Sequence, residues 1–161
     1  MTRLPDDCFA LGDRLLSVEE ALTEFRSRLA VVAEAETVPL AAAEGRFLAG
    51  DLVADRSVPP HANAAVDGYA VHAGDLTPGA PTTLPVAGRA AAGHPFAGPV
   101  PRGTAIRIFT GAPLPAGPDM VVMQEDCPAA DGHVTLPAGL RRGAHIRQEG
   151  DDIRAGDTVL T

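Results

Sequence analysis

The hydrophobic pattern of the 161-residue chain changes its period at the Pro59–Pro60 pair. Before this pair, apolar residues recur at the three- and four-residue spacing of a helix, whereas after it they gather in short runs. Glycine and proline separate these runs, as is typical of strands joined by turns. The runs cover residues 68–72, 82–88, 104–110, 119–124 and 133–136. The pattern predicts an α+β fold that is mostly β, with a compact β-rich unit over residues 57–137.

The one strong helix signal follows an irregular lead-in over residues 1–16. Ser17 can cap the helix and Glu20 can reach back to it, which is the capping-box arrangement. We predict a helix over residues 18–30, with charged residues on its outer face. One face is apolar and needs a partner surface; its residues are Val18, Ala21, Leu22, Phe25 and Leu29.

The segments between this helix and the proline pair carry weaker signals. Residues 36–40 favour an extended piece, because the residue before a proline avoids the helical region. Residues 41–49 are compatible with a second, shorter helix, and residues 51–54 with a strand.

Two later segments also have predictable shapes. Residues 110–119 contain three prolines and two glycines, so we expect a loop of fixed backbone shape between two strands. Residues 153–160, IRAGDTVL, have the pattern of a hairpin-like β element around a Gly-Asp turn. Because the chain stops on this strand-like segment, we expect either a longer protein that continues past Thr161 or a truncated form.

Composition narrows the class of partner. The formal net charge is −8, which disfavours nucleic acid and anionic membrane surfaces. All thirteen basic residues are arginine, so a Schiff-base lysine and a P-loop lysine are excluded within this chain. Cys8 and Cys127 are far apart and form neither a disulfide framework nor a zinc motif. There is no long apolar run and no signal-peptide pattern, so we expect a soluble, cytoplasmic protein without a membrane partner.

Two polar residues stand at strand ends where chemistry is feasible. Asp67 precedes Gly68 and is either a turn residue or a carboxylate available as a base, a metal ligand or a water-holding group. Thr110 precedes Gly111, which fits a plain turn or a hydroxyl beside a backbone that a ligand can approach closely.

The other titratable groups favour structural interpretations. Glu125–Asp126 and the acidic run 149–152 are typical of solvated strand ends and turns with local ion pairs. None of the five histidines has the spacing of a metal ligand pair, so we expect no metal-binding histidine.

Three stretches, taken in order, resemble the MoeA family of molybdopterin molybdenumtransferases, which includes the E domain of gephyrin. Residues 57–71, SVPPHANAAVDGYAV, resemble the family's P-P-F-D-N-S-A-M-D-G-Y-A-V signature. Residues 105–126, AIRIFTGAPLPAGPDMVVMQED, are similar to its A-R-I-M-T-G-A-P-L-P motif and the strand that follows. Residues 146–160, IRQEGDDIRAGDTVL, match a third motif, and residues 38–55 resemble the family's lead-in.

The resemblance implies an activity and an architecture. The family inserts molybdenum from molybdate into adenylylated molybdopterin, releases AMP and requires Mg2+. It implies an elongated homodimer in which a β-rich domain, residues 57–137, is inserted into a small linking domain. Residues 1–56 and 138–161 would form that linking domain. In the family a pterin-binding α/β domain follows, and it faces the β-rich domain of the other subunit; this chain does not contain it.

The resemblance also implies the site. Asp67 and Thr110 occupy the positions that face the family's inter-subunit cleft, and Asn63, Gly68 and Gly111 are the implied substrate-binding residues. No metal ligand is assigned to this chain, and the Mg2+ ligands are expected outside it. Four positions depart from the signature: His61 replaces an aromatic residue, Ala62 an acid, Ala64 a serine and Val66 a methionine.

Two functions from different classes follow. The first is the N-terminal portion of a molybdopterin molybdenumtransferase, in which Asp67 positions water or a cation, and Thr110 and the Gly111 backbone donate hydrogen bonds to substrate oxygens. The second is a non-catalytic paralogue that dimerises or scaffolds cofactor assembly, which Ala62 and Ala64 favour. Arg107 is left out of the site, because strand alternation places it on the opposite face from Thr110.

Overall fold

A computed structural model describes residues 16–161 of the chain. Contacts divide the chain into two compact units, Met1–Ala49 and Gly50–Thr161, and each is described by itself. The predicted irregular lead-in up to residue 15 and Cys8 lie outside the described residues. Within the described part of the chain, no helix is long and apolar enough to cross a membrane.

The first unit contains the predicted helix. Helix α1 spans Val18–Arg28, and the capping box is confirmed: Ser17 Oγ accepts from the Glu20 N–H, and the Glu20 carboxylate accepts from the Ser17 N–H. None of the helix residues is buried in the described structure. The predicted second helix over 41–49 is wrong. Only a short 3-10 turn, η1 (Leu40–Ala42), forms in this region. Gly45 then adopts a left-handed φ of +75°, which a right-handed helix does not accommodate.

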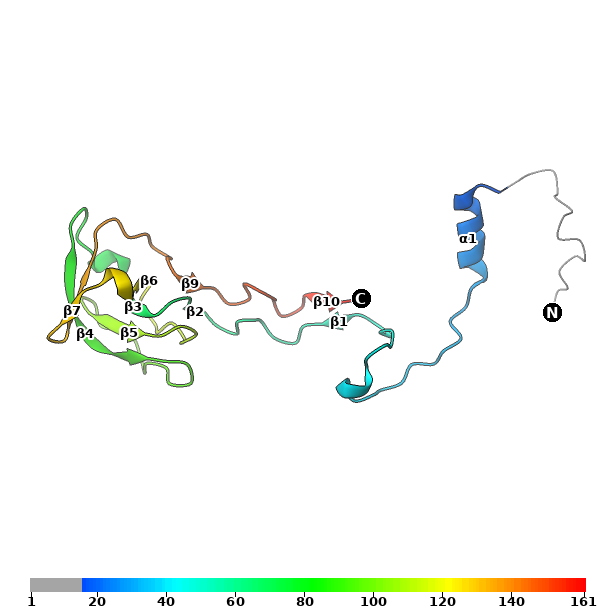
Figure 1. The fold of residues 1–161 in the computed structure, drawn as a ribbon, viewed down its shortest axis with the longest axis horizontal. Coiled ribbons are helices and arrows are strands. Elements are labelled where there is room, and N and C mark those ends of the chain that lie inside the picture. The colour runs from blue at the N-terminus through cyan, green and yellow to red at the C-terminus, as the bar shows by residue number, and fades with distance from the viewer. Residues whose placement is uncertain (1–15) are drawn as a thin grey trace, which may run out of the picture. The chain divides into compact units, whose positions relative to one another are not determined.

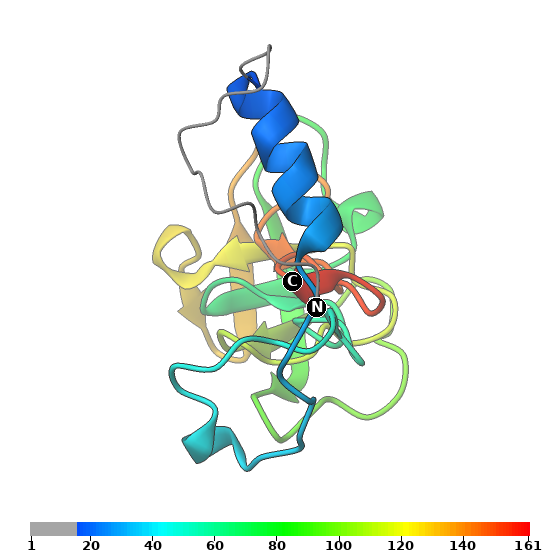
Figure 2. The same cartoon turned by 90° about the vertical axis from the view of Figure 1, so that its right-hand side faces the viewer.

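The second unit is built on a six-stranded sheet in the order β6-β3-β5-β4-β8-β7, seen in Figures 1 and 2. All neighbours are antiparallel except β4 and β5, which are parallel. The five predicted runs are confirmed as strands. The sheet consists of β3 (Gly68–Val71), β4 (Thr82–Ala90), β5 (Ala105–Ile108), β6 (Met120–Met123), β7 (Ala129–Ala130) and β8 (His133–Leu136).

Strand β4 belongs to both halves of this sheet. Its residues 82–85 pair with β8, and residues 86–90 pair with β5 after a register shift between Val86 and Gly88. A Cβ on Gly88 would lie 2.5 Å from the Phe96 ring, so a larger residue at this irregularity would require the Phe96 side chain to move. The shared strand joins the two halves into one curled sheet.

Strand alternation divides the core between the two faces of the sheet. One cluster contains Tyr69, Val71, Met120 and Val122, and the other contains their neighbours Ala70 and Val121 together with Ile106 and Ile108. Because β3, β5 and β6 are buried on both sides, their backbone positions are fixed where they end. Those strand ends carry the candidate site.

Two strand pairs connect the sheet to the rest of the second unit. Strand β1 (Leu52–Val53) pairs with β10 (Thr158–Leu160), and β2 (Asn63–Ala64) pairs with β9 (Ile146–Arg147), both antiparallel. The segments that enter and leave the sheet therefore run side by side, as Figure 1 shows. Two short helical turns, η2 (Ala73–Asp75) and η3 (Gln124–Asp126), follow β3 and β6.

The predicted hairpin within residues 153–160 is wrong. A tight turn forms where Asp157 Oδ2 accepts from the Arg154 N–H at 2.8 Å, but the flanking residues pair elsewhere. Ile153 bridges Val58, and β10 pairs with β1, because a distant segment offers a longer ladder than the short run itself. The fold class, mostly β with one N-terminal amphipathic helix, is confirmed. The boundaries at residues 57 and 137 stay a prediction.

Candidate functional site

Asp67 and Thr110 meet where two paired strands end. Asp67 directly precedes β3, Thr110 lies two residues past β5, and Gly68 pairs with Ile108 across the ladder. Both the N–H and the hydroxyl of Thr110 donate to the same Asp67 oxygen, Oδ1, at 2.8 and 2.6 Å. The two residues that the sequence proposes as catalytic are 43 positions apart and are in direct contact.

The surroundings of Asp67 keep its carboxylate charged. Hydrogen bonds from the Thr110 hydroxyl and then from the Thr110 N–H lower the pKa of Asp67 below its ordinary value, with a smaller contribution from the positive Arg107. Among residues 16–161, no hydrogen bond engages the second oxygen, Oδ2. Asp67 therefore presents one free, ionised oxygen, which suits it to accept from water or a hydroxyl or to hold a cation, and not to donate a proton.

The loop after Thr110 is attached to β2. Gly111 has a left-handed φ of +77°, where glycine is favoured, and its N–H donates to Ala64 O at 2.9 Å. The Ala64 N–H donates in turn to Ala112 O at 3.0 Å. The hydroxyl proton of Thr110 and the Gly111 N–H are thus already used within the chain. In this arrangement Thr110 orients Asp67 and can offer a ligand only its oxygen lone pairs.

Asn63 and Gly68 occupy more enclosed positions. Asn63 pairs with Arg147 in the β2–β9 ladder, and its Oδ1 is buried with no hydrogen-bond donor among the described residues. Gly68 is buried in β3, and a Cβ there would lie only 1.9 Å from the backbone oxygen of Val122. The structure gives Gly68 a packing role, because β6 passes too close to admit a side chain.

Arg107 contacts this site although strand alternation led us to exclude it. Its Nη1 donates to Gly68 O at 2.8 Å, its Nη2 bonds Gln124 Oε1, and its guanidinium carbon lies 4.5 Å from the centre of the Phe109 ring. The alternation argument does not apply at Thr110, although no hydrogen bond joins Arg107 to Asp67 or Thr110. Thr110 lies beyond the end of β5, where alternation no longer applies, while Arg107 shares the side of the sheet with Tyr69, its partner in the ladder.

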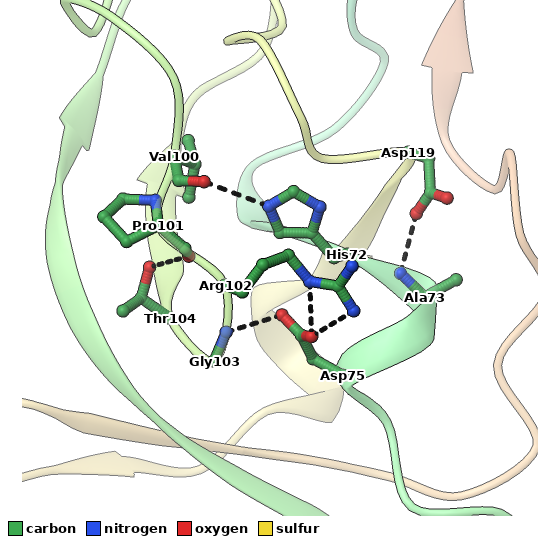
Figure 3. A network of polar contacts seen from close by, with 9 residues as sticks. All are labelled: His72, Ala73, Asp75, Val100, Pro101, Arg102, Gly103, Thr104 and Asp119. Atoms are coloured by element: carbon green, nitrogen blue, oxygen red, sulfur yellow. Dashed lines mark hydrogen bonds and ion pairs between the residues drawn. The ribbon is translucent and has the colours of Figure 1, made fainter.

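A second polar cluster fastens loop 100–104 to η2 (Figure 3). Arg102 Nε and the Gly103 N–H each donate to Asp75 at 2.7 Å, and His72 Nε2 lies 3.1 Å from Val100 O. Burial alone would raise the pKa of Asp75, but these bonds and the Arg102 charge bring it below its ordinary value. Every group drawn here is paired within the chain, which indicates a structural cluster.

Asp67 is partly exposed at the start of β3, an inner strand of the sheet. A hollow of about 350 Å³ adjoins Arg107 on the side of Tyr69 and residues 129–133, and a larger one of about 600 Å³ lies along α1; Asp67 lines neither. Within the described residues, no group of three or more His, Cys, Asp or Glu side chains could hold a metal ion.

Comparison with known proteins identifies the family. A family model described as "MoeA N-terminal region (domain I and II)" matches residues 16–161. The chain belongs to the MoeA N-terminal family. The resemblance inferred from the three sequence motifs is therefore confirmed.

Curated relatives of this MoeA N-terminal chain are named as molybdenumtransferases. The chain is 37% identical over 147 residues to the molybdopterin molybdenumtransferase of Haemophilus influenzae, covering 91% of this chain and 36% of that protein. It is 43% identical over 127 residues to molybdopterin molybdenumtransferase 2 of Mycobacterium tuberculosis, covering 77% of this chain and 31% of that protein. The chain thus spans 31–36% of the length of these two relatives.

Solved MoeA structures share the fold. The molybdopterin biosynthesis moeA protein from Pyrococcus horikoshii OT3 has a TM-score of 0.72 and 36% identity, covering 78% of this chain and 34% of that one. A second structure, of the moeA protein from Pyrococcus horikosii, has a TM-score of 0.75 and 31% identity, covering 92% of this chain and 38% of that one.

Proposed function

We propose that this chain takes part in molybdenum cofactor biosynthesis as the N-terminal portion of a molybdopterin molybdenumtransferase. In the proposed reaction, molybdenum from molybdate enters adenylylated molybdopterin and AMP is released. The observation that carries the proposal is the ionised Asp67, which is partly exposed at the start of β3 and accepts two hydrogen bonds from Thr110. The chain would supply one wall of an inter-subunit active site.

The charge of Asp67 limits its role. Molybdate and phosphate are anions, and a bare carboxylate repels their oxygens. Asp67 Oδ2 therefore acts on a group that carries a proton or a positive charge, such as the water or hydroxyl that exchanges at the reacting centre. Thr110 keeps Oδ1 occupied, so that a single oxygen of known direction faces the substrate. Asn63 and Gly111 would shape the adjoining backbone, and Gly68 would keep β3 and β6 close together.

Mg2+ is part of this proposal, but its site would lie outside the chain. Asp67 offers one free carboxylate oxygen, and residues 16–161 contain no set of three metal-ligating side chains. Mg2+ usually binds one or two carboxylates together with phosphate oxygens and waters. The described residues do not form a complete Mg2+ site.

The partners in this proposal are a second copy of the chain and a pterin-binding α/β domain. Helix α1 exposes its apolar face, including Val18, Leu22, Phe25 and Leu29, which supports the proposal that it contributes to a homodimer. The partial exposure of Asp67 supports the proposal that another domain closes the site. A cytoplasmic location and the absence of a nucleic-acid or membrane partner stay predictions.

AMP release tests the proposal. The chain is mixed with the separately expressed remainder of the Haemophilus influenzae relative, adenylylated molybdopterin, Mg2+ and molybdate. Asp67→Asn should lower the rate of AMP release by about 100-fold or more, the ordinary cost of losing a proton-accepting group. Thr110→Ala should lower it less, because the Thr110 N–H still donates to Asp67. Asp51→Asn, just before β1, and Thr83→Ala, in the β4–β8 ladder, change exposed residues that do not contact Asp67, and they are the matched controls.

The non-catalytic scaffold is the second candidate, and Ala62 and Ala64 favour it because they replace an acid and a serine of the family signature. A scaffold would bind the remainder of the relative without supporting AMP release. AMP release that survives both Asp67→Asn and Thr110→Ala would refute the catalytic role of these residues. A complex that forms but stays inactive under every condition would establish the scaffold.

A further inference from the structure

Arg107 is a half-buried cation without a carboxylate partner. Among residues 16–161, six arginines form ion pairs with Asp or Glu, and Arg107 is not one of them. Taking a guanidinium out of water is costly unless its donors are satisfied. Here the compensation comes from three neutral oxygens and from the faces of the Tyr69 and Phe109 rings. The oxygens are Gly68 O, Gln124 Oε1 and, at 3.4 Å, Ile108 O.

Three contacts of Arg107 involve residues that are linked to Asp67. Gly68, whose carbonyl accepts from Nη1, is the next residue after Asp67. Gln124, whose side chain accepts from Nη2, donates its backbone N–H to Asp67 O at 3.0 Å. Phe109, whose ring lies against the guanidinium, directly precedes Thr110, which holds the Asp67 carboxylate. Gly68 and Gln124 are thus one residue and one hydrogen bond from Asp67, and Phe109 is linked to it through Thr110.

We propose that Arg107 is a positioning residue for Asp67. It ties the start of β3, the end of β5 and the start of η3 together, so that the Asp67 carboxylate meets the Thr110 donors with Oδ2 left free. Arg107 acts through these neighbours and does not touch the substrate. The inference rests on the proposed function for its catalytic consequence, but not for the geometry itself.

The charge of Arg107 acts in the same direction as its contacts. Its positive field adds to the Thr110 hydrogen bonds that lower the pKa of Asp67. Other titratable groups on neighbouring elements are Glu125 and Asp126 in η3, and Asp131 and His133 beside the hollow that Arg107 lines. Arg89 on β4 is also near, with its guanidinium carbon 5.0 Å from the centre of the Phe109 ring. Replacement of Arg107 by a neutral side chain should therefore change both the orientation of Asp67 and its titration.

The test uses the 161-residue chain labelled with carbon-13 at the aspartate carboxyls, with the Asp67 signal assigned through Asp67→Asn. Two readouts are followed: the titration midpoint of Asp67 and the hydrogen-exchange rate of the Thr110 amide. Arg107→Gln should raise the midpoint and speed the exchange. Arg107→Lys keeps the positive charge but loses the planar guanidinium that binds two oxygens at once. The Thr110 amide should therefore exchange faster, while the titration midpoint of Asp67 should change less than in Arg107→Gln. Arg102→Gln, which removes an arginine bound to Asp75, should change neither.

The outcomes separate this inference from the proposed function. In the AMP-release assay, Arg107→Gln should lower kcat by about 10-fold with KM unchanged. This is the ordinary effect of losing a residue that orients a catalytic group without touching the substrate. Unchanged Asp67 titration and Thr110 exchange in Arg107→Gln would overturn the inference, whatever the activity. If both readouts change while Asp67→Asn releases AMP normally, the positioning role stands and the proposed function fails. If Arg107→Gln does not fold, unchanged Thr110 exchange in Arg107→Lys overturns the inference.

Discussion

Replacement of Gly68 by alanine tests whether this glycine serves packing. An added Cβ would lie 1.9 Å from the oxygen and 2.8 Å from the carbonyl carbon of Val122, and 3.3 Å from the Met123 Cα. All three atoms belong to the backbone of β6, so no side chain can rotate out of the way. Strands β3 and β6 would have to separate by about 1 Å or more to restore an ordinary contact distance.

The expected cost follows from this displacement. Overpacking in a well-packed core costs about 1–3 kcal/mol, and a weakened ladder hydrogen bond adds about 1 kcal/mol. We expect Gly68→Ala to lower the free energy of unfolding by about 2–4 kcal/mol, equivalent to a fall in Tm of about 5–15 °C for a chain of this size. The contrasting variant is Gly111→Ala, where no atom lies within 4 Å and only the left-handed φ opposes a side chain. It should cost about 1–2 kcal/mol.

Urea unfolding of both variants provides the measurement. The chain has one tyrosine and no tryptophan, so the fluorescence of the buried Tyr69, next to Gly68, reports unfolding at this site. Circular dichroism provides an independent signal for the same transition. A Gly68→Ala chain as stable as the unmodified chain, or more stable than Gly111→Ala, would refute the packing explanation for Gly68.

Three other properties can be predicted from the second polar cluster, the free cysteine and the helix cap. The Asp75 carboxylate has a lowered pKa in the folded state, so its stabilising contribution is present above the unfolded pKa and is lost as pH falls through the folded pKa. In Asp75→Asn, the free energy of unfolding should therefore fall less steeply as pH is lowered below about 4. The same pH dependence in the variant and the unmodified chain would contradict this. Burial raises the pKa of Cys127 to about 11, so in a Cys8→Ala chain the native thiol should react with a disulfide reagent at pH 8 far more slowly than in urea; equal rates would exclude burial. Ser17→Ala removes the acceptor of the Glu20 N–H and should cost helix α1 about 1 kcal/mol, measured as lost helicity by NMR chemical shifts; unchanged shifts would show that the capping box contributes nothing.

The sequence by itself determined the local features of this protein. The capping box predicted the start of α1, and the alternating runs predicted five strands, because side-chain spacing and turn residues act over a few positions. Two other local predictions were wrong. The helix over 41–49 is interrupted by the left-handed φ of Gly45. The hairpin over 153–160 is replaced by pairing with β1 and Val58, which spacing within the segment does not record.

Only the tertiary structure decided the composition of the candidate site. Asp67 and Thr110 were chosen through the family resemblance. The register of β3 on β5 is what brings both Thr110 donors to the same Asp67 oxygen, Oδ1. The same register brings Arg107 into contact with Gly68, next to Asp67. The alternation of side chains along β5 could not predict this, because the alternation does not extend to residues beyond the end of the strand. The family resemblance implied that Gly68 binds substrate, which stays a prediction; its packing role, set by the approach of β6, could be seen only in the structure. Contacts between distant strands depend on register and twist, and these are properties of the folded sheet.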